Sequence, residues 1–386
     1  MSEFRTIREL CSVVVDCPHS TPKWTANGKI VIRNKNIKHG KIDFSSPSYT
    51  DDEHFAQRIK RAKPQPGDII ITREAPIGDV GMIPENTECC LGQRMVLLRA
   101  NQSVCDNFYL LYSLQSLYVQ HQISWSEGTG TTVSNLRIPH LEQIQIPYLP
   151  LEQQAKISSV LRALEEKIEN NRRLNDNLQQ QAAALFSSLY DRTNTEVRFT
   201  DLIQILGGGT PKTGENTYWN GNIAFFTPKD VGTPYTLITE KTITEEGLSH
   251  CNSRLYPVNT VFVTARGTVG KVGMSGVPMA MNQSCYALVG KETNQLLVYF
   301  YTLKAVDRLK HKASGAVFDA ITTRDFESEQ IMKLSDDDAK AFLCIAEPMF
   351  QKVLNNCIEN LRLSTLRDSL LPKLMSGEVD VSAVQL

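Results

Sequence analysis

The chain contains two copies of one unit, and this internal repeat constrains its fold more than any other feature. Residues 67–82 read GDIIITREAPIGDVGM and residues 259–274 read NTVFVTARGTVGKVGM. Thr72, Gly78, Gly81 and Met82 recur at one constant spacing as Thr264, Gly270, Gly273 and Met274. Allowing small length changes, other matches are Thr21–Lys23 with Thr210–Lys212, Lys35 with Lys229, Gln93 with Gln283, Leu141 with Phe326, and Ile146 with Ile331. Such self-similarity indicates a duplicated structural unit.

Each copy ends in a long helical pattern. Apolar or small residues recur at alternating steps of four and three, namely Leu161, Leu164, Ile168, Asn171, Asn175, Leu178, Ala182, Leu185 and Leu189. The second copy gives Phe342, Ala346, Met349, Val353, Asn356, Asn360, Leu363, Arg367, Leu370 and Leu374. A period of about 3.5 residues is typical of a coiled-coil seam. Because both copies carry two asparagines at equivalent seam positions, we favour paired antiparallel helices over two ordinary core helices.

The starts of both helices carry local signals. Pro150 and Glu152 predict a first helix over about residues 151–191. Ser335 followed by three aspartates predicts the start of the second, with a capping side chain and favourable charge. Pro348 lies soon after and is expected either to kink this helix or to delay its start.

The remaining sequence predicts two globular α/β (α+β) domains. With 386 residues, the chain exceeds what one hydrophobic core usually supports. We predict domains at residues 1–149 and 197–332, with helical regions at residues 150–196 and 333–386. Residues 69–72 and 261–264 resemble short strands, and residues 105–122 and 295–310 resemble amphipathic helices. The fold class is therefore mixed α/β domains with two long antiparallel helices and an internal pseudo-two-fold repeat.

No constellation of catalytic residues stands out. The stretch Gly267–Lys271 lacks both the glycine spacing and the following Ser or Thr of a phosphate-binding P-loop. The tetrapeptide typical of amino-group DNA methyltransferases is absent, and the histidines do not show metal-ligand spacing. We expect no cofactor and no metal in this chain.

Composition adds limits of its own. Hydrophobic residues make up 41% and charged residues 22%, as in soluble globular proteins. The apolar runs are too short for a membrane span and the start lacks a signal peptide, so we expect a cytoplasmic protein. The nine cysteines form no Cys-x-x-Cys pair and are expected to be buried or incidental thiols. The net charge of −1 does not itself support DNA binding, so any DNA surface must be local.

Taken together, the sequence resembles the specificity subunit of type I restriction–modification systems. The residues that carry this resemblance are IPYLPLEQQAKI at 146–157, EKIENNRRLN at 166–175, LRDSLLPKLMSGE at 366–378, and Thr210–Lys212 with YWNG at 218–221 and FTPKD at 226–230. The second helix departs from the family pattern, since SDDD at 335–338 replaces the proline- and glutamine-rich start.

The resemblance implies a non-catalytic subunit. Each globular domain would read one half of a split site in double-stranded DNA, and the helices would hold the two readers apart. Two methyltransferase subunits would dock on the helices and bring S-adenosylmethionine. Restriction and translocase subunits, using ATP and Mg, would join them for cleavage. Two other possibilities stay open: a coiled-coil protein scaffold without sequence-selective DNA binding, and an enzyme that acts alone.

Candidate DNA-binding residues follow from side-chain chemistry. Lys and Arg contact phosphates, and Arg, Lys, Asn and Gln can also read bases. The candidates are Lys23, Arg33, Lys35, Lys38 and Arg94 in the first copy, and Lys212, Lys229, Arg266, Lys271 and Gln283 in the second. The basic run Arg58, Lys60, Arg61 and Lys63 fits either a solvated surface or a phosphate contact. Residues shared by both copies are expected to be structural, because the copies would read different bases.

Overall fold

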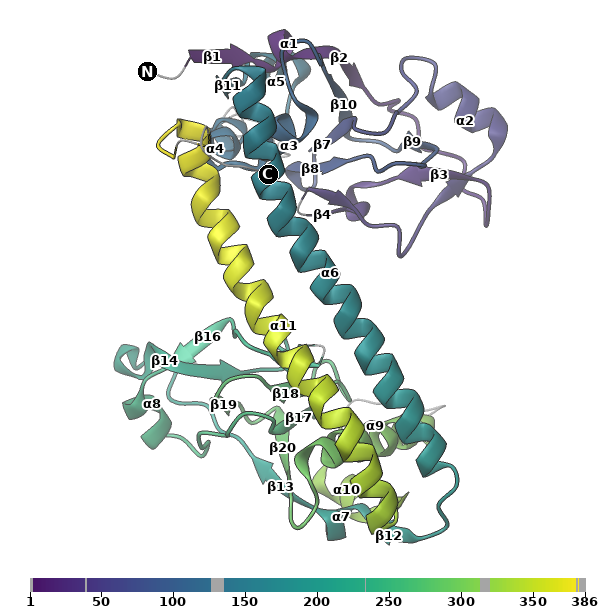
Figure 1. Cartoon of the computed structure of the whole chain (residues 1–386), viewed down its shortest axis with the longest axis vertical. Coiled ribbons are helices and arrows are strands. Elements are labelled where there is room, and N and C mark those ends of the chain that lie inside the picture. Colours follow the sequence, from purple (N-terminus) through teal and green to yellow (C-terminus); the bar gives the residue numbers. More distant parts are fainter. Residues whose placement is uncertain are drawn as a thin grey trace. The chain divides into compact units, whose positions relative to one another are not determined.

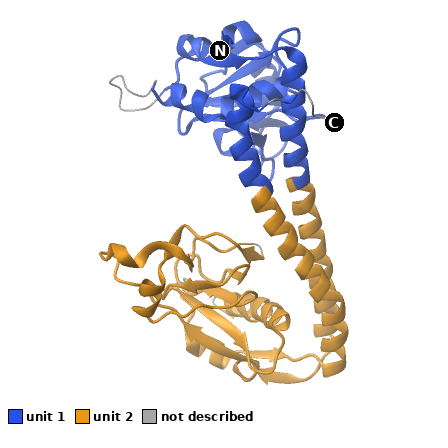
Figure 2. Ribbon diagram, turned by 60° about the vertical axis from the view of Figure 1, so that its left-hand side comes forward, with its two compact units in different colours: residues 1–167, 363–386 blue, residues 168–362 orange. Residues whose placement is uncertain are grey.

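The computed structural model describes residues 3–38, 40–125, 135–232, 234–312, 320–379 and 381. The chain divides into two compact units, unit 1 with residues 1–167 and 363–386 and unit 2 with residues 168–362 (Figure 2). Both units contain part of each of the two long helices, α6 (Leu151–Tyr190) and α11 (Asp336–Ser376) (Figure 1).

Unit 1 is a mixed α/β domain. Its strands are β1 (Glu3–Thr6), β2 (Cys11–Asp16), β3 (Lys29–Ile32), β4 (Ile37–Lys38), β5 (Lys41–Ile42), β6 (Tyr49–Thr50), β7 (Ile69–Arg73), β8 (Ile77–Met82), β9 (Cys89–Leu91), β10 (Met95–Ala100) and β11 (Gln145–Tyr148). Its shorter helices are α1 (Ile7–Leu10), the 3-10 helix η1 (Asn34–Asn36), α2 (Asp52–Arg58), α3 (Asn107–Gln115), α4 (Leu117–Trp125) and α5 (Ile138–Gln143). The sheets have the orders β2-β10-β7-β8, β6-β3-β9, β1-β11 and β4-β5.

Unit 2 repeats this plan. Its strands are β12 (Glu196–Arg198), β13 (Ile203–Gly207), β14 (Trp219–Phe226), β15 (Tyr235–Thr236), β16 (Lys241–Ile243), β17 (Val261–Thr264), β18 (Val272–Ser275), β19 (Met279–Met281), β20 (Cys285–Gly290) and β21 (Gln330–Met332). Its shorter helices are α7 (Phe199–Leu202), η3 (Asn216–Tyr218), α8 (Glu245–Ser249), α9 (Gln295–Lys312) and α10 (Thr323–Ser328). The sheet orders are β13-β20-β17-β18-β15, β16-β14-β19 and β12-β21.

Most strands of the two units match, which confirms the predicted internal repeat; unit 1 has the additional β4-β5 pair, and β15 of unit 2 joins the main sheet in parallel with β18. In each unit, four antiparallel strands of the main sheet are accompanied by a smaller sheet with one parallel pair, β3 with β9 in unit 1 and β14 with β19 in unit 2. The matched residues Ile146 and Ile331 both lie in the strand that pairs with the first strand of the unit. Leu141 and Phe326, also matched, are fully buried in equivalent short helices.

The long helices complete the hydrophobic core of each unit. In unit 1, Ile157 and Leu161 of α6 and Leu374 of α11 pack with the sheet and with α3 and α4. In unit 2, Phe186 of α6 and Phe342 of α11 join the aromatic core around α9, with ring centroids 5.5 Å apart. Of the apolar seam positions predicted from the heptad pattern, Leu161, Ile168, Ala182, Leu189, Phe342, Ala346, Val353 and Leu374 are buried, and Leu164, Leu178, Leu185, Met349, Leu363 and Leu370 are partly buried.

The polar seam positions pair crosswise in unit 2. Asn171 Nδ2 donates to Asn360 Oδ1 at 2.9 Å, and Asn356 Nδ2 donates to Asn175 Oδ1 at 2.7 Å. As α6 advances, its contacts step backward along α11, so the helices run antiparallel here as predicted. In unit 1, the contact of Glu165 with Arg367 at 3.6 Å continues the same order.

One local prediction needs correction, and one of the two alternatives for Pro348 is excluded. The expected single helix over residues 105–122 is broken, because Ser116 is extended (φ −64°, ψ 146°) and ends α3. The Ser116 hydroxyl accepts a hydrogen bond from the Val119 N–H at 3.4 Å, as a helix N-cap does, and α4 begins there. The second long helix begins at Asp336, where the Ser335 hydroxyl accepts from the Asp338 N–H at 3.1 Å. Pro348 therefore does not delay its start.

Candidate nucleic-acid interface

Four loops of unit 1 meet where strands β2, β3, β7 and β9 end and β10 begins. We call them the first loop cluster, made of residues 17–24, 33–36, 74–76 and 92–94. Asn34 Nδ2 donates to the Glu74 carbonyl at 2.6 Å, and Arg94 Nε lies 3.3 Å from the Glu74 carboxylate. Gln93 Nε2 donates to the His19 carbonyl and, at 3.4 Å, to the Thr21 hydroxyl.

The buried side chain of Arg58 holds two loops of this cluster together. Its side chain is 6% exposed and donates to four backbone carbonyls, those of Pro18, Ser20, Leu91 and Gly92, at 2.7–3.1 Å. Burial lowers the pKa of the guanidinium from its ordinary value. The basic run around residue 58 was expected to be either a solvated surface or a phosphate contact. Neither interpretation fits Arg58, because its buried side chain hydrogen-bonds the backbone of two loops and holds them together.

Unit 2 assembles the second loop cluster from the equivalent segments, residues 207–212, 227–232, 265–271 and 282–284. The Thr210 hydroxyl donates to Gln283 Oε1 at 2.5 Å, and the Thr268 hydroxyl donates to the Pro228 carbonyl at 3.2 Å. The Ala265 N–H donates to the Ser284 carbonyl at 2.8 Å. The same four chain segments therefore converge in both copies, at the same ends of equivalent strands.

Most first-copy candidates have an acidic or aromatic neighbour. Lys23 lies 3.4 Å from Asp51, and Lys38 lies 2.8 Å from Asp43. The Arg33 guanidinium lies over the ring of Trp24, 5.0 Å from its centroid, and Trp24 is 45% exposed. Lys35 donates to the Ser46 hydroxyl at 3.2 Å, and Arg94 contacts Glu74 as described above. The loop contacts bring Arg33 and Arg94 into one cluster, whereas Lys38 belongs to the separate β4–β5 hairpin.

These ion pairs are exposed and leave the cations available. The hydrogen bond from Lys38 holds the pKa of Asp43 well below its usual range. The pKa of Asp51 is held at about 2, first by hydrogen bonds from His54 and then by Lys23. Exposed ion pairs of this kind are screened by water and salt and hold the lysine ammonium groups only weakly.

The second-copy candidates concentrate on the second loop cluster. Arg266 and Lys271 are exposed on the segment between β17 and β18, and Lys229 lies 3.5 Å from Glu240. The Lys212 side chain is exposed, and the Lys212 carbonyl accepts a hydrogen bond from Trp219 Nε1 at 3.2 Å. Gln283 is also exposed, and its Oε1 accepts a hydrogen bond from the Thr210 hydroxyl, whereas Gln93 Nε2 donates to the Thr21 hydroxyl, so the same two positions are in contact in both copies.

Sequence reasoning missed the aromatic partner in the first cluster. Trp24 follows the candidate Lys23 directly, and an exposed tryptophan next to basic residues was the available signal. Together with Arg33 it presents a flat face and a cation, which suits contact with a sugar or base. The two clusters thus present Arg and Lys donors on loops held by buried or backbone contacts.

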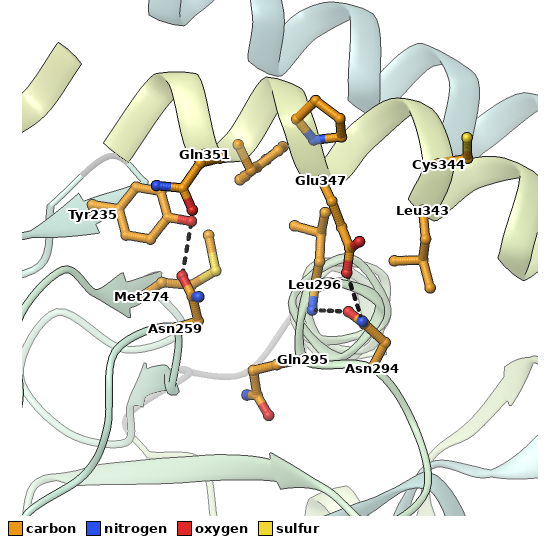
Figure 3. A pocket seen from close by; sticks show the side chains of 12 residues that line it. Tyr235, Asn259, Met274, Asn294, Gln295, Leu296, Leu343, Cys344, Glu347 and Gln351 are labelled. Atoms are coloured by element: carbon orange, nitrogen blue, oxygen red, sulfur yellow. Dashed lines mark hydrogen bonds between the residues drawn. The ribbon is translucent and has the colours of Figure 1, made fainter. Parts of the chain in front are cut away.

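A pocket of about 470 Å³ in unit 2 lies apart from these donors (Figure 3). It is lined by the beginning of α9, the first turns of α11 and Tyr235 of β15. Its polar groups already bind one another, since Asn294 donates to Glu347 at 2.7 Å and Tyr235 donates to Asn259 at 3.0 Å. None of the candidate DNA-binding residues lines it.

Comparison with known proteins identifies the family. The family model for the type I restriction modification DNA specificity domain matches residues 3–180 and 192–333. The chain belongs to this family. The family resemblance inferred from the sequence is thereby confirmed, and with it the mixed α/β fold with two repeats and long helices.

Individual relatives agree with this membership. The chain is 23% identical over 341 residues to the type I restriction enzyme MjaIX specificity subunit of Methanocaldococcus jannaschii, covering 82% of this chain and 78% of that one. It is 28% identical over 186 residues to the HindI specificity subunit of Haemophilus influenzae, covering 47% and 40%. The crystal structure of a type I system S subunit from M. genitalium has the same fold, with a TM-score of 0.62, 18% identity, and coverage of 97% and 96%.

Other kinds of site find no support in the part of the chain that the structure describes. No cluster of His, Cys, Asp and Glu side chains there has a metal-binding arrangement. Among the described helices, none is both long and apolar enough to cross a membrane. The nine cysteines are free thiols, and Cys344 is exposed whereas Cys11, Cys17, Cys89, Cys90, Cys105 and Cys285 are buried.

Proposed function

We propose that this specificity protein reads a bipartite site in double-stranded DNA, one half with each loop cluster. The observation that carries the proposal is that both units converge four equivalent loops at the same strand ends and place different basic side chains on them. Protein contacts to the DNA phosphates fix the orientation of the protein on the duplex, and Arg, Lys, Asn or Gln side chains then read base edges in the major groove. The recognition domains would be residues 1–149 and 197–332.

The long helices, residues 150–196 and 333–386, would set the spacing of the half-sites and dock the partners. The partners would be two methyltransferase subunits carrying S-adenosylmethionine, and restriction and translocase subunits using ATP and Mg. The net charge of −1 is compatible with this division, because partner subunits would supply much of the surface that covers the phosphate backbone. The chain itself would be non-catalytic and act in the cytoplasm.

The decisive experiment is genome-wide mapping of N6-methyladenine with this gene present and then deleted. We expect methylation at one split motif to disappear on deletion. An unchanged map, with the methyltransferase expressed and active, would instead favour the protein-scaffold alternative. Methylation by the purified chain alone with S-adenosylmethionine would support the enzyme alternative.

A second experiment tests the division of labour between the copies. Residues 1–149 are replaced by the equivalent segment of another family member, and the methylated motif is determined again. We expect one half of the motif to change and the other to stay. A change in both halves, or in neither, would contradict the proposal.

A further inference from the structure

Equivalent hairpin turns in the two units are held by a side chain from a neighbouring helix. The turns join β7 to β8 in unit 1 and β17 to β18 in unit 2; the turn glycine of unit 2, Gly270, lies between the strands, and that of unit 1, Gly78, is the second residue of β8. Gln120 Nε2 of α4 donates to the Gly78 carbonyl at 3.0 Å, and Lys310 Nζ of α9 donates to the Gly270 carbonyl at 2.8 Å. The donors differ chemically, yet each binds the carbonyl of the same glycine of the repeat.

The turns are fixed from the opposite side as well. The Thr72 hydroxyl accepts a hydrogen bond from the Asp79 N–H, and the Thr264 hydroxyl accepts one from the Lys271 N–H, both at 2.9 Å. Both threonines are fully buried. The backbone after each turn glycine is thus held by a strand on one side and a helix on the other.

Close packing leaves these turns little room to move. Gly78 and Gly270 have φ values of 82° and 73°, which favour glycine. A Cβ atom on Gly78 would lie 3.1 Å from Gln120 Oε1, and one on Gly270 would lie 2.6 Å from Lys310 Cε. The helix side chain therefore touches the turn itself.

Equivalent charged residues of the two hairpins have opposite sign; Asp79, Arg266 and Lys271 are exposed, whereas Glu74 is partly buried and accepts a hydrogen bond from Asn135 Nδ2 at 2.7 Å. Glu74 of the first copy occupies the position of Arg266 in the second, and Asp79 occupies the position of Lys271. Carboxylates accept hydrogen bonds, as from the amino group of cytosine, whereas Arg and Lys donate, as to the acceptors of guanine. The hairpins therefore combine a shared backbone with side chains of opposite hydrogen-bonding type.

The helix end that carries Lys310 is itself anchored. Arg308 and Lys312, on the same helix as Lys310, lie 2.8 Å and 2.5 Å from the carboxylate of Glu329, which follows α10 and is fully buried. In unit 1, Gln120 Nε2 also donates to the Leu114 carbonyl at 2.7 Å. Additional contacts therefore restrict both turn-binding side chains, through the end of α9 for Lys310 and through the side chain itself for Gln120.

We infer that Gln120 and Lys310 are positioning residues for two specificity-determining hairpins, which carry Glu74 and Asp79 in one copy and Arg266 and Lys271 in the other. This inference rests on the proposed function. Without the side-chain donor, each hairpin keeps its residues but loses the fixed direction from which they meet the bases.

The test uses the complete methyltransferase complex with the full-length chain and maps methylation by sequence. Lys310→Met keeps the packing stem and removes the ammonium, and Lys310→Gln installs the donor that the first copy uses. The matched control is Lys291→Met, because Lys291 Nζ also donates to a backbone carbonyl, that of Thr200, at 2.8 Å, away from the hairpin. Gln120→Met makes the same test in unit 1.

We expect Lys310→Met to relax the second half of the motif, raising methylation of single-mismatch sites there about tenfold, part of the discrimination that a good base contact supplies. The first half should stay unchanged, Lys310→Gln should restore selectivity, and Lys291→Met should behave as wild type. Gln120→Met should relax the first half alone. The melting temperature of each variant, measured in parallel, should stay close to that of wild type.

Two results would overturn the inference. If Lys310 contacts phosphate instead, Lys310→Met and Lys310→Gln will both weaken methylation uniformly without relaxing the motif. Relaxation of both halves together, or a loss of selectivity that tracks a lowered melting temperature in every variant, would show a general structural role. Failure of the proposed function looks different, since the wild-type complex would then methylate no split motif.

Discussion

The crosswise asparagine pairs in the helix seam allow a quantitative prediction. Asn356 is fully buried and donates to Asn175, which is 6% exposed, at 2.7 Å. Replacing Asn356 by Leu leaves the carboxamide of Asn175 facing an apolar group. An unsatisfied buried polar group costs about 1–3 kcal/mol, so Asn356→Leu should lower the free energy of unfolding by that amount. Asn175→Leu should have a similar effect.

The double variant should recover the loss. Replacing both partners by apolar groups is close to neutral or stabilising, because no polar group is stranded. Within the described residues, Asn356 Oδ1 has no hydrogen-bond partner, so the wild-type pair is itself incompletely satisfied. We therefore expect the double variant to be at least as stable as wild type, so that the coupling energy equals the sum of the two single losses, about 2–6 kcal/mol.

The assay is urea unfolding of the full-length chain, followed by far-ultraviolet circular dichroism. Asn170→Leu is the matched control, because Asn170 is exposed beside the seam and should change stability by less than about 0.5 kcal/mol. If the double variant loses the sum of the two single losses, the asparagines are not coupled across the seam. The argument for a paired antiparallel register in unit 2 would then be refuted.

Three further predictions concern charged groups. Arg58→Met should destabilise unit 1 by about 1–3 kcal/mol in urea, because it strands buried loop carbonyls; unchanged stability would contradict the structural tie. Glu329→Gln should destabilise unit 2 by a similar amount, since it weakens the charge-assisted hydrogen bond from Lys312 and removes the ion pair with Arg308, and wild-type unfolding would refute this. Hydrogen bonds from Lys29 and Lys63 lower the pKa of Glu88 from 4.5 to about 2. The stability from this group is present above pH 4.5 and lost as pH falls toward 2, so Glu88→Gln should flatten the acid-unfolding profile in that window, and an unchanged profile would argue against it.

Features that repeat along the chain were predictable from sequence, because buried apolar residues recur at the period of the helix that buries them. The heptad seam predicted many buried positions of α6 and α11, such as Leu161 and Val353, but not Phe186 or Phe350, and the matched segments predicted the repeat. The antiparallel direction also followed, since equivalent asparagines in two repeats meet crosswise only when the helices oppose each other. The break at Ser116 was missed, because the apolar pattern continues through it and only the hydroxyl contacts show a new helix start.

Charged side chains were harder to interpret, because sequence does not show their partners. Arg58 lies in a basic run, yet its guanidinium is buried against backbone carbonyls that come from distant loops. The polar side chain of Gln283 has a distant partner too, since its Oε1 accepts a hydrogen bond from Thr210. These contacts join residues far apart in the sequence, and no local pattern reports them.

The repeat itself separates scaffold from recognition. Where the copies share a residue, as with Thr72 and Thr264, that side chain binds the backbone of its own unit. Where they differ at an equivalent hairpin position, as with Glu74 and Arg266, the residue is not fully buried and carries charge. A protein that uses one fold to read two different DNA sequences needs this partition. The shared backbone presents side chains to the bases in the same geometry in both copies, so the variable side chains must discriminate between the sequences. The fixed turns then have a functional reason: a hydrogen bond to a base edge discriminates only if its donor or acceptor is held in place before DNA binds.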